Sequence, residues 1–249
     1  MKKIMISLVL IYLGVGCLLF IKQRDFLYYP VDSIKHTLDQ EVFKNDDESI
    51  TTTVLNKGNI NAIIYFGGNA ETVDYNAESF SAIFPKHTVF LVKYRGYGGS
   101  SGIPEEEGIY SDALYIFDKV KLKYKSVSII GRSLGSSVAT LVASKRNINK
   151  LVLITPFDSI QDMAQEQFPI YPMSLLLKDK YDSLSRVNSI TAETLVIAAE
   201  NDQVIGKNHT GRLVNAFPSS QITLEIIKGK GHNDISNSKK YYGLLGQFI

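Results

Sequence analysis

The five residues from Gly131 to Gly135 have the pattern Gly-x-Ser-x-Gly, with Ser133 at its centre. An apolar run at 127–130 precedes the pattern, and a segment of small, helix-compatible residues follows it. Between a strand and a helix, glycines at these positions allow a tight, strained turn that holds the serine hydroxyl above a sheet. The pattern predicts Ser133 as a nucleophile; the alternative is a chance match in a glycine-bearing turn.

A serine hydroxyl needs a base to take its proton, and an acid that orients this base. With a serine in such a turn, the acid and then the base follow it along the chain. Two histidines follow Ser133. His232 lies in a glycine-rich loop after the last predicted strand, whereas His209 lies in a predicted amphipathic helix, where a surface or capping role is expected. We therefore expect His232 to be the base.

Asp202 is the predicted acid, because it directly follows the predicted strand 194–199 and would lie beside the base at the carboxyl edge of the sheet. Glu200 is the nearest alternative. Asp158, which follows the predicted strand 150–154, is the other position from which an acid can reach the base. Asp179 and Asp182 are expected to be solvated charges of a lid.

Two backbone N–H groups are candidates for an oxyanion hole, which stabilises the charge that develops on a carbonyl oxygen. The first belongs to Leu134, which follows the serine and begins a helix. The second belongs to Asn69, in a glycine-bearing loop after the apolar run 62–66. The alternative for this loop is a tight turn that binds no ligand.

Short apolar runs alternate with helical patterns along most of the chain, which predicts a mainly parallel sheet covered by helices on both faces. A helical face is formed by Ile109, Ala113, Ile116, Phe117 and Val120. Residues 41–55 are expected to supply leading antiparallel strands. Residues 158–189 break the alternation and predict a small lid over the carboxyl ends of the strands. The predicted parallel strands are 61–66, 88–94, 126–130, 150–154, 194–199 and 222–227.

The N-terminus carries Lys2 and Lys3, then an uncharged run of 18 residues at 4–21, then Lys22 and Arg24. Such a run just spans a bilayer core as a helix. We therefore predict residues 1–24 as a single-pass membrane anchor and 25–249 as one catalytic domain. The alternative is a signal segment whose cleavage releases a secreted protein. Lysines on one side balance Lys22 and Arg24 on the other, so the charges favour neither orientation.

Composition argues against several other classes of protein and of binding site. The net charge of +2 gives no basic stripe, which argues against a nucleic-acid partner. Cys17 is the single cysteine, so the chain has neither an internal disulfide nor a cysteine-based metal site. The four histidines lack the spacing of zinc ligands, and no metal is expected.

Several sequence blocks together resemble the α/β-hydrolase superfamily, in particular the membrane-anchored branch that includes serine-aminopeptidase-like proteins and protein depalmitoylases. The resemblance covers about residues 23–235 and implies an α/β-hydrolase fold with a triad at Ser133, Asp202 and His232. The acyl transfer expected of such a triad requires no cofactor. Two departures occur: Gly67 stands where relatives usually have histidine, and Ala198-Ala199 replaces a usual His-Gly. The blocks are Phe26-Leu27-Tyr28-Tyr29-Pro30, Gly67-Gly68-Asn69-Ala70, Tyr94-Arg95-Gly96-Tyr97-Gly98-Gly99-Ser100, Gly131–Gly135, Thr155-Pro156-Phe157, Leu177-Lys178-Asp179-Lys180-Tyr181-Asp182-Ser183 and Gly231-His232-Asn233-Asp234.

These observations predict a serine hydrolase that cleaves a carboxylic ester or thioester of an acylated substrate through an acyl-enzyme intermediate. An apolar lid and a membrane anchor fit such a substrate. The alternatives are a peptidase of the aminopeptidase type, which needs an acidic patch for the free amine, and a catalytically silent membrane scaffold.

Overall fold

A computed structural model describes all 249 residues. Its centre is an eight-stranded sheet with the order β1-β2-β4-β3-β5-β6-β7-β8. Strands β3 to β8 run parallel, while β1 and β2 form an antiparallel hairpin that joins the sheet against β4. The strands are β1 (Asp39–Asn45), β2 (Glu48–Leu55), β3 (Asn61–Phe66), β4 (His87–Val92), β5 (Ser126–Arg132), β6 (Lys150–Ile154), β7 (Glu193–Ala199) and β8 (Ile222–Ile227).

Helices cover both faces of this sheet. The helices are α1 (Lys2–Leu27), α2 (Ala77–Ile83), α3 (Glu106–Lys121), α4 (Leu134–Lys145), α5 (Ile160–Gln167), α6 (Met173–Leu176), α7 (Lys207–Ala216) and α8 (Lys239–Phe248), with short 3-10 turns η1 (Val73–Asn76), η2 (Leu184–Ser189) and η3 (Ile235–Asn237). The predicted architecture, a mainly parallel sheet with helices on both faces and leading antiparallel strands, is confirmed.

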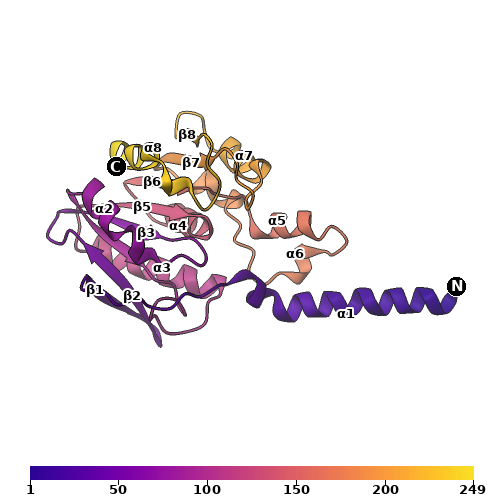
Figure 1. The fold of residues 1–249 in the computed structure, drawn as a ribbon. Helices are drawn as coiled ribbons and strands as arrows, with labels where there is room; N and C mark the ends of the chain where they lie inside the picture. Colours follow the sequence, from indigo (N-terminus) through magenta and orange to yellow (C-terminus); the bar gives the residue numbers. More distant parts are fainter.

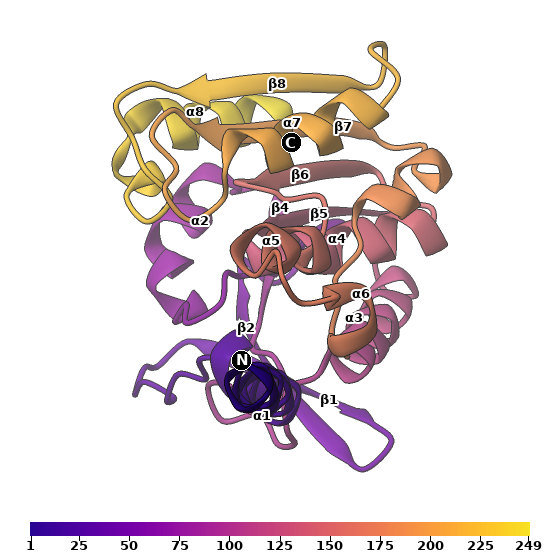
Figure 2. The ribbon, with the colours of Figure 1, turned by 90° about the vertical axis from the view of Figure 1, so that its right-hand side faces the viewer.

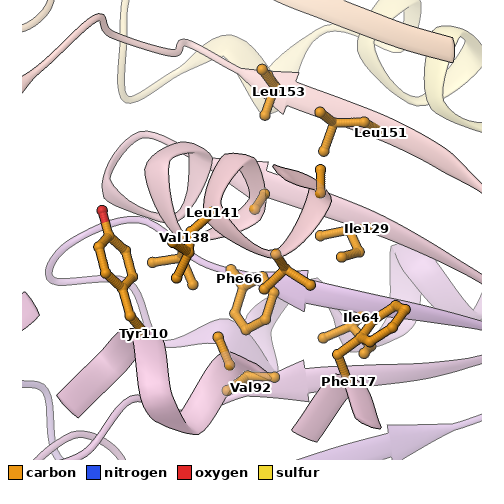
Figure 3. Packing of buried hydrophobic residues seen from close by; sticks show 14 of the residues in the cluster. Ile64, Phe66, Val92, Tyr110, Phe117, Ile129, Val138, Leu141, Leu151 and Leu153 are labelled. Atoms are coloured by element: carbon orange, nitrogen blue, oxygen red, sulfur yellow. The ribbon is translucent and has the colours of Figure 1, made fainter. Parts of the chain in front are cut away.

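Alternation along the central strands builds two apolar layers. In β3, Ile64 and Phe66 face the layer that includes α3, α4 and α7, while Ile63 and Tyr65 face the layer that includes α2 and α8. All four side chains have no measurable exposure, as the period of two requires for a strand buried on both faces. Figure 3 shows the first layer, in which side chains of α3 and α4 pack onto β3, β5 and β6.

Helix α1 projects from the domain, with the N-terminus far from the sheet (Figure 1). It is long and apolar enough to cross a membrane, and only 6% of its most apolar 18-residue stretch is buried. Helices α5 and α6 belong to the predicted lid region 158–189 and lie on the same side of the domain as α1, which Figure 2 views end-on. The carboxyl edge of the sheet, α1 and these two helices therefore meet in one region.

Candidate active site

Ser133 lies in a sharp turn between β5 and α4 and has φ 50° and ψ −118°. This is a strained conformation for a residue with a side chain. Glycine is required on both sides of Ser133 because other backbone atoms approach too closely for a side chain. A Cβ on Gly131 would lie 2.2 Å from the Gly135 carbonyl oxygen, and a Cβ on Gly135 would lie 2.1 Å from the Phe66 carbonyl oxygen. The strained turn expected from the Gly-x-Ser-x-Gly pattern is present.

The structure brings Ser133, His232 and Asp202 together in one chain of hydrogen bonds. His232 Nε2 lies 2.9 Å from Ser133 Oγ, and His232 Nδ1 lies 2.8 Å from Asp202 Oδ2. His232 comes from the loop after β8 and Asp202 from the loop after β7, so neighbouring strands deliver the two groups. This geometry suits a base that removes the serine proton while a carboxylate orients its ring.

The carboxylate of Asp202 is held on both of its oxygens. Its Oδ1 accepts hydrogen bonds from the backbone N–H groups of Val204 and Ile205, at 2.9 and 2.8 Å. Burial acts to raise the pKa of Asp202, but the hydrogen bonds from His232 and from these N–H groups outweigh it and lower the pKa below its usual value. Asp202 is therefore ionised at neutral pH.

The rival acids have other partners. Glu200 accepts a hydrogen bond from the backbone N–H of Gly229 at 2.8 Å. Asp158 is fully buried and lies 2.7 Å from His209 Nδ1. The expectation of a surface His209 is wrong, because the residue is buried and its ring is held between Asp158 and Glu166.

The expectation of a solvated Asp179 is wrong as well. Its side chain is only 4% exposed and accepts two hydrogen bonds from the Arg24 guanidinium, at 2.7 and 3.2 Å. It also accepts one from the Glu106 backbone N–H at 3.1 Å. The carboxylate is buried because Arg24 of α1 supplies a cation for it, which the spacing within residues 158–189 does not reveal.

The two candidate oxyanion donors flank the serine. Leu134 is the first residue of α4, so its N–H has no acceptor within the helix. The Asn69 N–H makes no hydrogen bond within the chain. Its loop lies close to Ser133, since a Cβ on Gly68 would be 3.6 Å from the Ser133 Cβ.

The Asn69 side chain turns toward the segment that leaves α1. Its Oδ1 accepts hydrogen bonds from the Tyr29 backbone N–H at 3.0 Å and from the Tyr97 hydroxyl at 2.7 Å. Its Nδ2 donates to the Leu27 carbonyl at 2.5 Å. These bonds fix the loop and leave the backbone N–H as the group available to a substrate.

Glu71 positions the same loop and was not predicted from the sequence. Its carboxylate accepts hydrogen bonds from the Gly68 N–H at 2.6 Å and the Tyr65 hydroxyl at 2.7 Å. Arg132 lies 3.6 Å away and donates to the His232 carbonyl at 3.3 Å. Burial lowers the pKa of Arg132, but the Glu71 charge and the neighbouring Tyr65 and Tyr241 together outweigh it, and the pKa is raised. The only sequence feature that could have indicated this role of Glu71 is its position two residues after Asn69, the predicted oxyanion donor.

A polar cavity of about 380 Å³ opens beside Ser133 and His232. Glu71 and Arg132 are its charged lining groups, and asparagine, serine, threonine and tyrosine side chains supply most of the remainder. No group of three or more His, Cys, Asp or Glu side chains has the arrangement of a metal site. The cavity therefore offers hydrogen-bonding groups directly beside the serine.

The family model described as the alpha/beta hydrolase fold matches residues 61–176. An uncharacterized protein of Mycobacterium tuberculosis is 33% identical over 178 residues, which cover 70% of this chain and 63% of that protein. The chain thus matches less than two thirds of the length of this mycobacterial relative. An uncharacterized membrane protein of Saccharomyces cerevisiae is 29% identical over 218 residues, covering 83% of this chain and 72% of the relative.

Solved structures share the fold at low sequence identity. An esterase of Pyrococcus furiosus has a TM-score of 0.71 at 15% identity, covering 89% of this chain and 97% of the esterase. Est1E of Butyrivibrio proteoclasticus, solved with ferulic acid, has a TM-score of 0.69 at 13% identity, covering 84% and 95%. The chain has the α/β-hydrolase fold, which the family model and these structures share.

Proposed function

We propose that this protein is a membrane-anchored serine hydrolase that cleaves a carboxylic ester or thioester. The observation that carries the proposal is the unbroken chain of hydrogen bonds from Ser133 through His232 to Asp202, at a strained turn of the fold. A turn that only connected a strand to a helix would need neither the strain nor a buried histidine aimed at the hydroxyl.

In the proposed mechanism, His232 Nε2 takes the Ser133 proton as Oγ bonds to the carbonyl carbon of the substrate. The N–H groups of Leu134 and Asn69 stabilise the oxyanion, each contributing roughly 3–4 kcal/mol by analogy with measured donors. Collapse breaks the bond to the leaving oxygen or sulfur, which receives the proton from His232. Water then attacks the acyl-serine with His232 again as base, and the acid and free serine are released.

An apolar groove between α1 and the lid supports an acyl chain as part of the substrate. The groove has a volume of about 410 Å³, and nine of its ten lining residues are hydrophobic. One wall, Leu27, is hydrogen-bonded to the oxyanion loop through Asn69. The opposite wall begins at Ile160, six residues after Ile154 at the end of β6. The Ile154 carbonyl accepts a hydrogen bond from the Ser133 N–H at 2.9 Å. Each wall is thus linked to the site through the chain, although the groove and the polar cavity share no lining residue.

The polar cavity favours an ester or thioester over a peptide with a free N-terminus. Glu71 is the one carboxylate that lines it, and the hydrogen bonds from Gly68, Tyr65 and Asn76 already occupy this group. A free ammonium therefore finds no unpaired carboxylate beside Ser133. Hydroxyl and amide groups remain for a polar leaving group.

Contacts between α1 and the lid support an anchor that is retained rather than cleaved. Arg24 pairs with Asp179 at 2.7 Å, and the Gln23 side chain accepts a hydrogen bond from the Lys178 N–H at 2.6 Å. Further toward the N-terminus, Tyr12 stacks on Tyr171 with ring centroids 4.6 Å apart. Removal of α1 would expose the apolar groove and leave the buried Asp179 without its cation.

The substrate proposal is tested with p-nitrophenyl esters of increasing chain length and with amino-acid arylamides. We expect hydrolysis of the esters, with kcat/KM increasing with chain length until the groove is filled, and little hydrolysis of the arylamides. Preferential cleavage of the arylamides would contradict the ester proposal, and inertness toward both series would support a catalytically silent protein.

A further inference from the structure

The tip of the lid, residues 168–175, leads from the end of α5 into α6 and exposes apolar side chains. Ile170 is 69% exposed, Leu175 is 80% exposed and Phe168 is 40% exposed. No charged residue occurs between Glu166 and Lys178. Since soluble surfaces rarely expose a contiguous apolar segment of this kind, the tip has the composition of a contact with a protein or a membrane.

The lid tip lies against the middle of α1. The Tyr12 hydroxyl donates to the Ile170 carbonyl at 2.9 Å, and the Tyr171 hydroxyl donates to the Tyr12 carbonyl at 3.1 Å, while the two rings stack. Tyr12 precedes Lys22 by ten residues, which is roughly 15 Å along a helix. If Lys22 marks the membrane surface, the lid tip reaches about half-way through the hydrocarbon layer.

The carbonyl groups of the tip are arranged as a low-dielectric environment requires, whereas the Ile170 N–H has no acceptor within the chain. All five carbonyl groups from Phe168 to Pro172 accept a hydrogen bond within the chain, from the Tyr12 hydroxyl, the Gln165 side chain or backbone N–H groups. Two of the five residues are prolines, which have no N–H to satisfy. Non-helical backbone at membrane depth is tolerated only where such groups are satisfied by protein. An aqueous loop has no such need.

We propose that the lid tip is inserted into the hydrocarbon layer beside α1 and forms a second membrane contact of the protein. The proposal commits to the lipid bilayer as partner, because the exposed tip is continuous with a helix that has the length and composition of a membrane span. It rests on the proposed anchor and is independent of the proposed hydrolase chemistry. As a consequence, the groove between α1 and the lid begins at the membrane surface, since Leu19 lies on the hydrocarbon side of Lys22 while Gln23 and Leu27 lie beyond it.

The absence of tryptophan from the chain permits a direct test. Single tryptophans are introduced by Ile170→Trp and Leu175→Trp in the lid tip and by Leu13→Trp in α1. The matched control is Leu122→Trp, because Leu122 is 84% exposed and ends α3 at the opposite edge of the sheet. Each full-length variant is reconstituted in phosphatidylcholine vesicles with or without bromine atoms on the acyl chains.

We expect brominated lipid to reduce the emission of Ile170→Trp and Leu175→Trp by the same fraction as that of Leu13→Trp, and to leave Leu122→Trp unchanged. The proposal is overturned if both tip variants respond like Leu122→Trp while Leu13→Trp is quenched. It is also overturned if Leu13→Trp escapes quenching, because α1 then lies outside the hydrocarbon. Neither readout depends on hydrolysis, so failure of the proposed activity is distinguished from failure of membrane insertion.

Discussion

Replacement of Glu71 by alanine tests whether this carboxylate positions the oxyanion loop. The substitution removes the acceptor of the Gly68 N–H and of the Tyr65 hydroxyl, and the counter-charge of Arg132. Water from the adjacent cavity has access to Gly68 and Arg132, since both line cavities that open there, whereas Tyr65 is fully buried. Because an unsatisfied buried group costs about 1–3 kcal/mol, we expect a total loss of about 3 kcal/mol.

This loss corresponds to a decrease in Tm of roughly 6–12 °C for a chain of this size. We expect kcat to decrease by up to about 100-fold, because the Gly68–Asn69 peptide is no longer held toward the oxyanion. Glu71→Gln keeps one oxygen for the Gly68 N–H and should restore most of the kcat, although not the pairing with Arg132. Thermal unfolding in detergent and hydrolysis of p-nitrophenyl butanoate measure the two effects.

Glu78 provides the control, because it is an exposed carboxylate in the neighbouring helix α2. Glu78→Ala should leave both Tm and kcat at their wild-type values. A Glu71→Ala protein with wild-type kcat would refute the positioning role, whatever its stability. A kcat that decreases equally in Glu71→Ala and Glu71→Gln would show that charge, rather than the geometry of the loop, is the contribution of this residue.

Three further substitutions follow from the same contacts. Asp202→Asn should reduce kcat by about 10⁴-fold by analogy with other triads. The variant should also have a lower Tm than the wild type at neutral pH, and this difference should vanish with acidification. Because the pKa of Asp202 is lowered in the folded state, the carboxylate stabilises the fold fully above its unfolded-state pKa, and this stabilisation is lost as the pH falls through the folded-state pKa. Gly135→Ala should prevent folding, because its Cβ would lie 2.1 Å from a carbonyl oxygen. The control Gly243→Ala, whose Cβ would have nothing within 4 Å, should leave the stability unchanged or raise it by about 0.5–1 kcal/mol. Yield of folded protein and thermal unfolding measure both. Asp179→Asn should lower the free energy of unfolding by roughly 1–2 kcal/mol, a modest loss because its partner Arg24 is partly exposed to solvent. The control Asp25→Asn, which breaks an exposed ion pair with Lys22, should leave the Tm unchanged.

Much of the fold was predictable because its signals are local. The strands 61–66, 150–154 and 222–227 were bounded correctly, since each is a short apolar run with a turn at its end. The Gly-x-Ser-x-Gly pattern carries its own steric explanation, so the position of Ser133 also followed from a short segment. Its neighbours His232 and Asp202 could be assigned because the carboxyl ends of adjacent parallel strands meet at one edge.

The remaining features depend on contacts between segments far apart in the sequence. Burial of Asp179 requires Arg24, which lies 155 residues earlier, and burial of His209 requires Asp158 and Glu166 of the lid region. Similarly, the role of Glu71 depends on Arg132 in the nucleophile turn. Patterns within one segment describe its own periodicity and turns, and they do not identify a distant partner that makes burial of a charge favourable.

The central claim is that Ser133 is a nucleophile activated by His232. It is tested most directly by treating the full-length protein in detergent with a fluorophosphonate probe and locating the adduct by mass spectrometry. We predict covalent labelling of wild-type protein on Ser133 alone, strongly reduced labelling in His232→Ala, and none in Ser133→Ala. Equal labelling of the wild-type and Ser133→Ala proteins would contradict the claim.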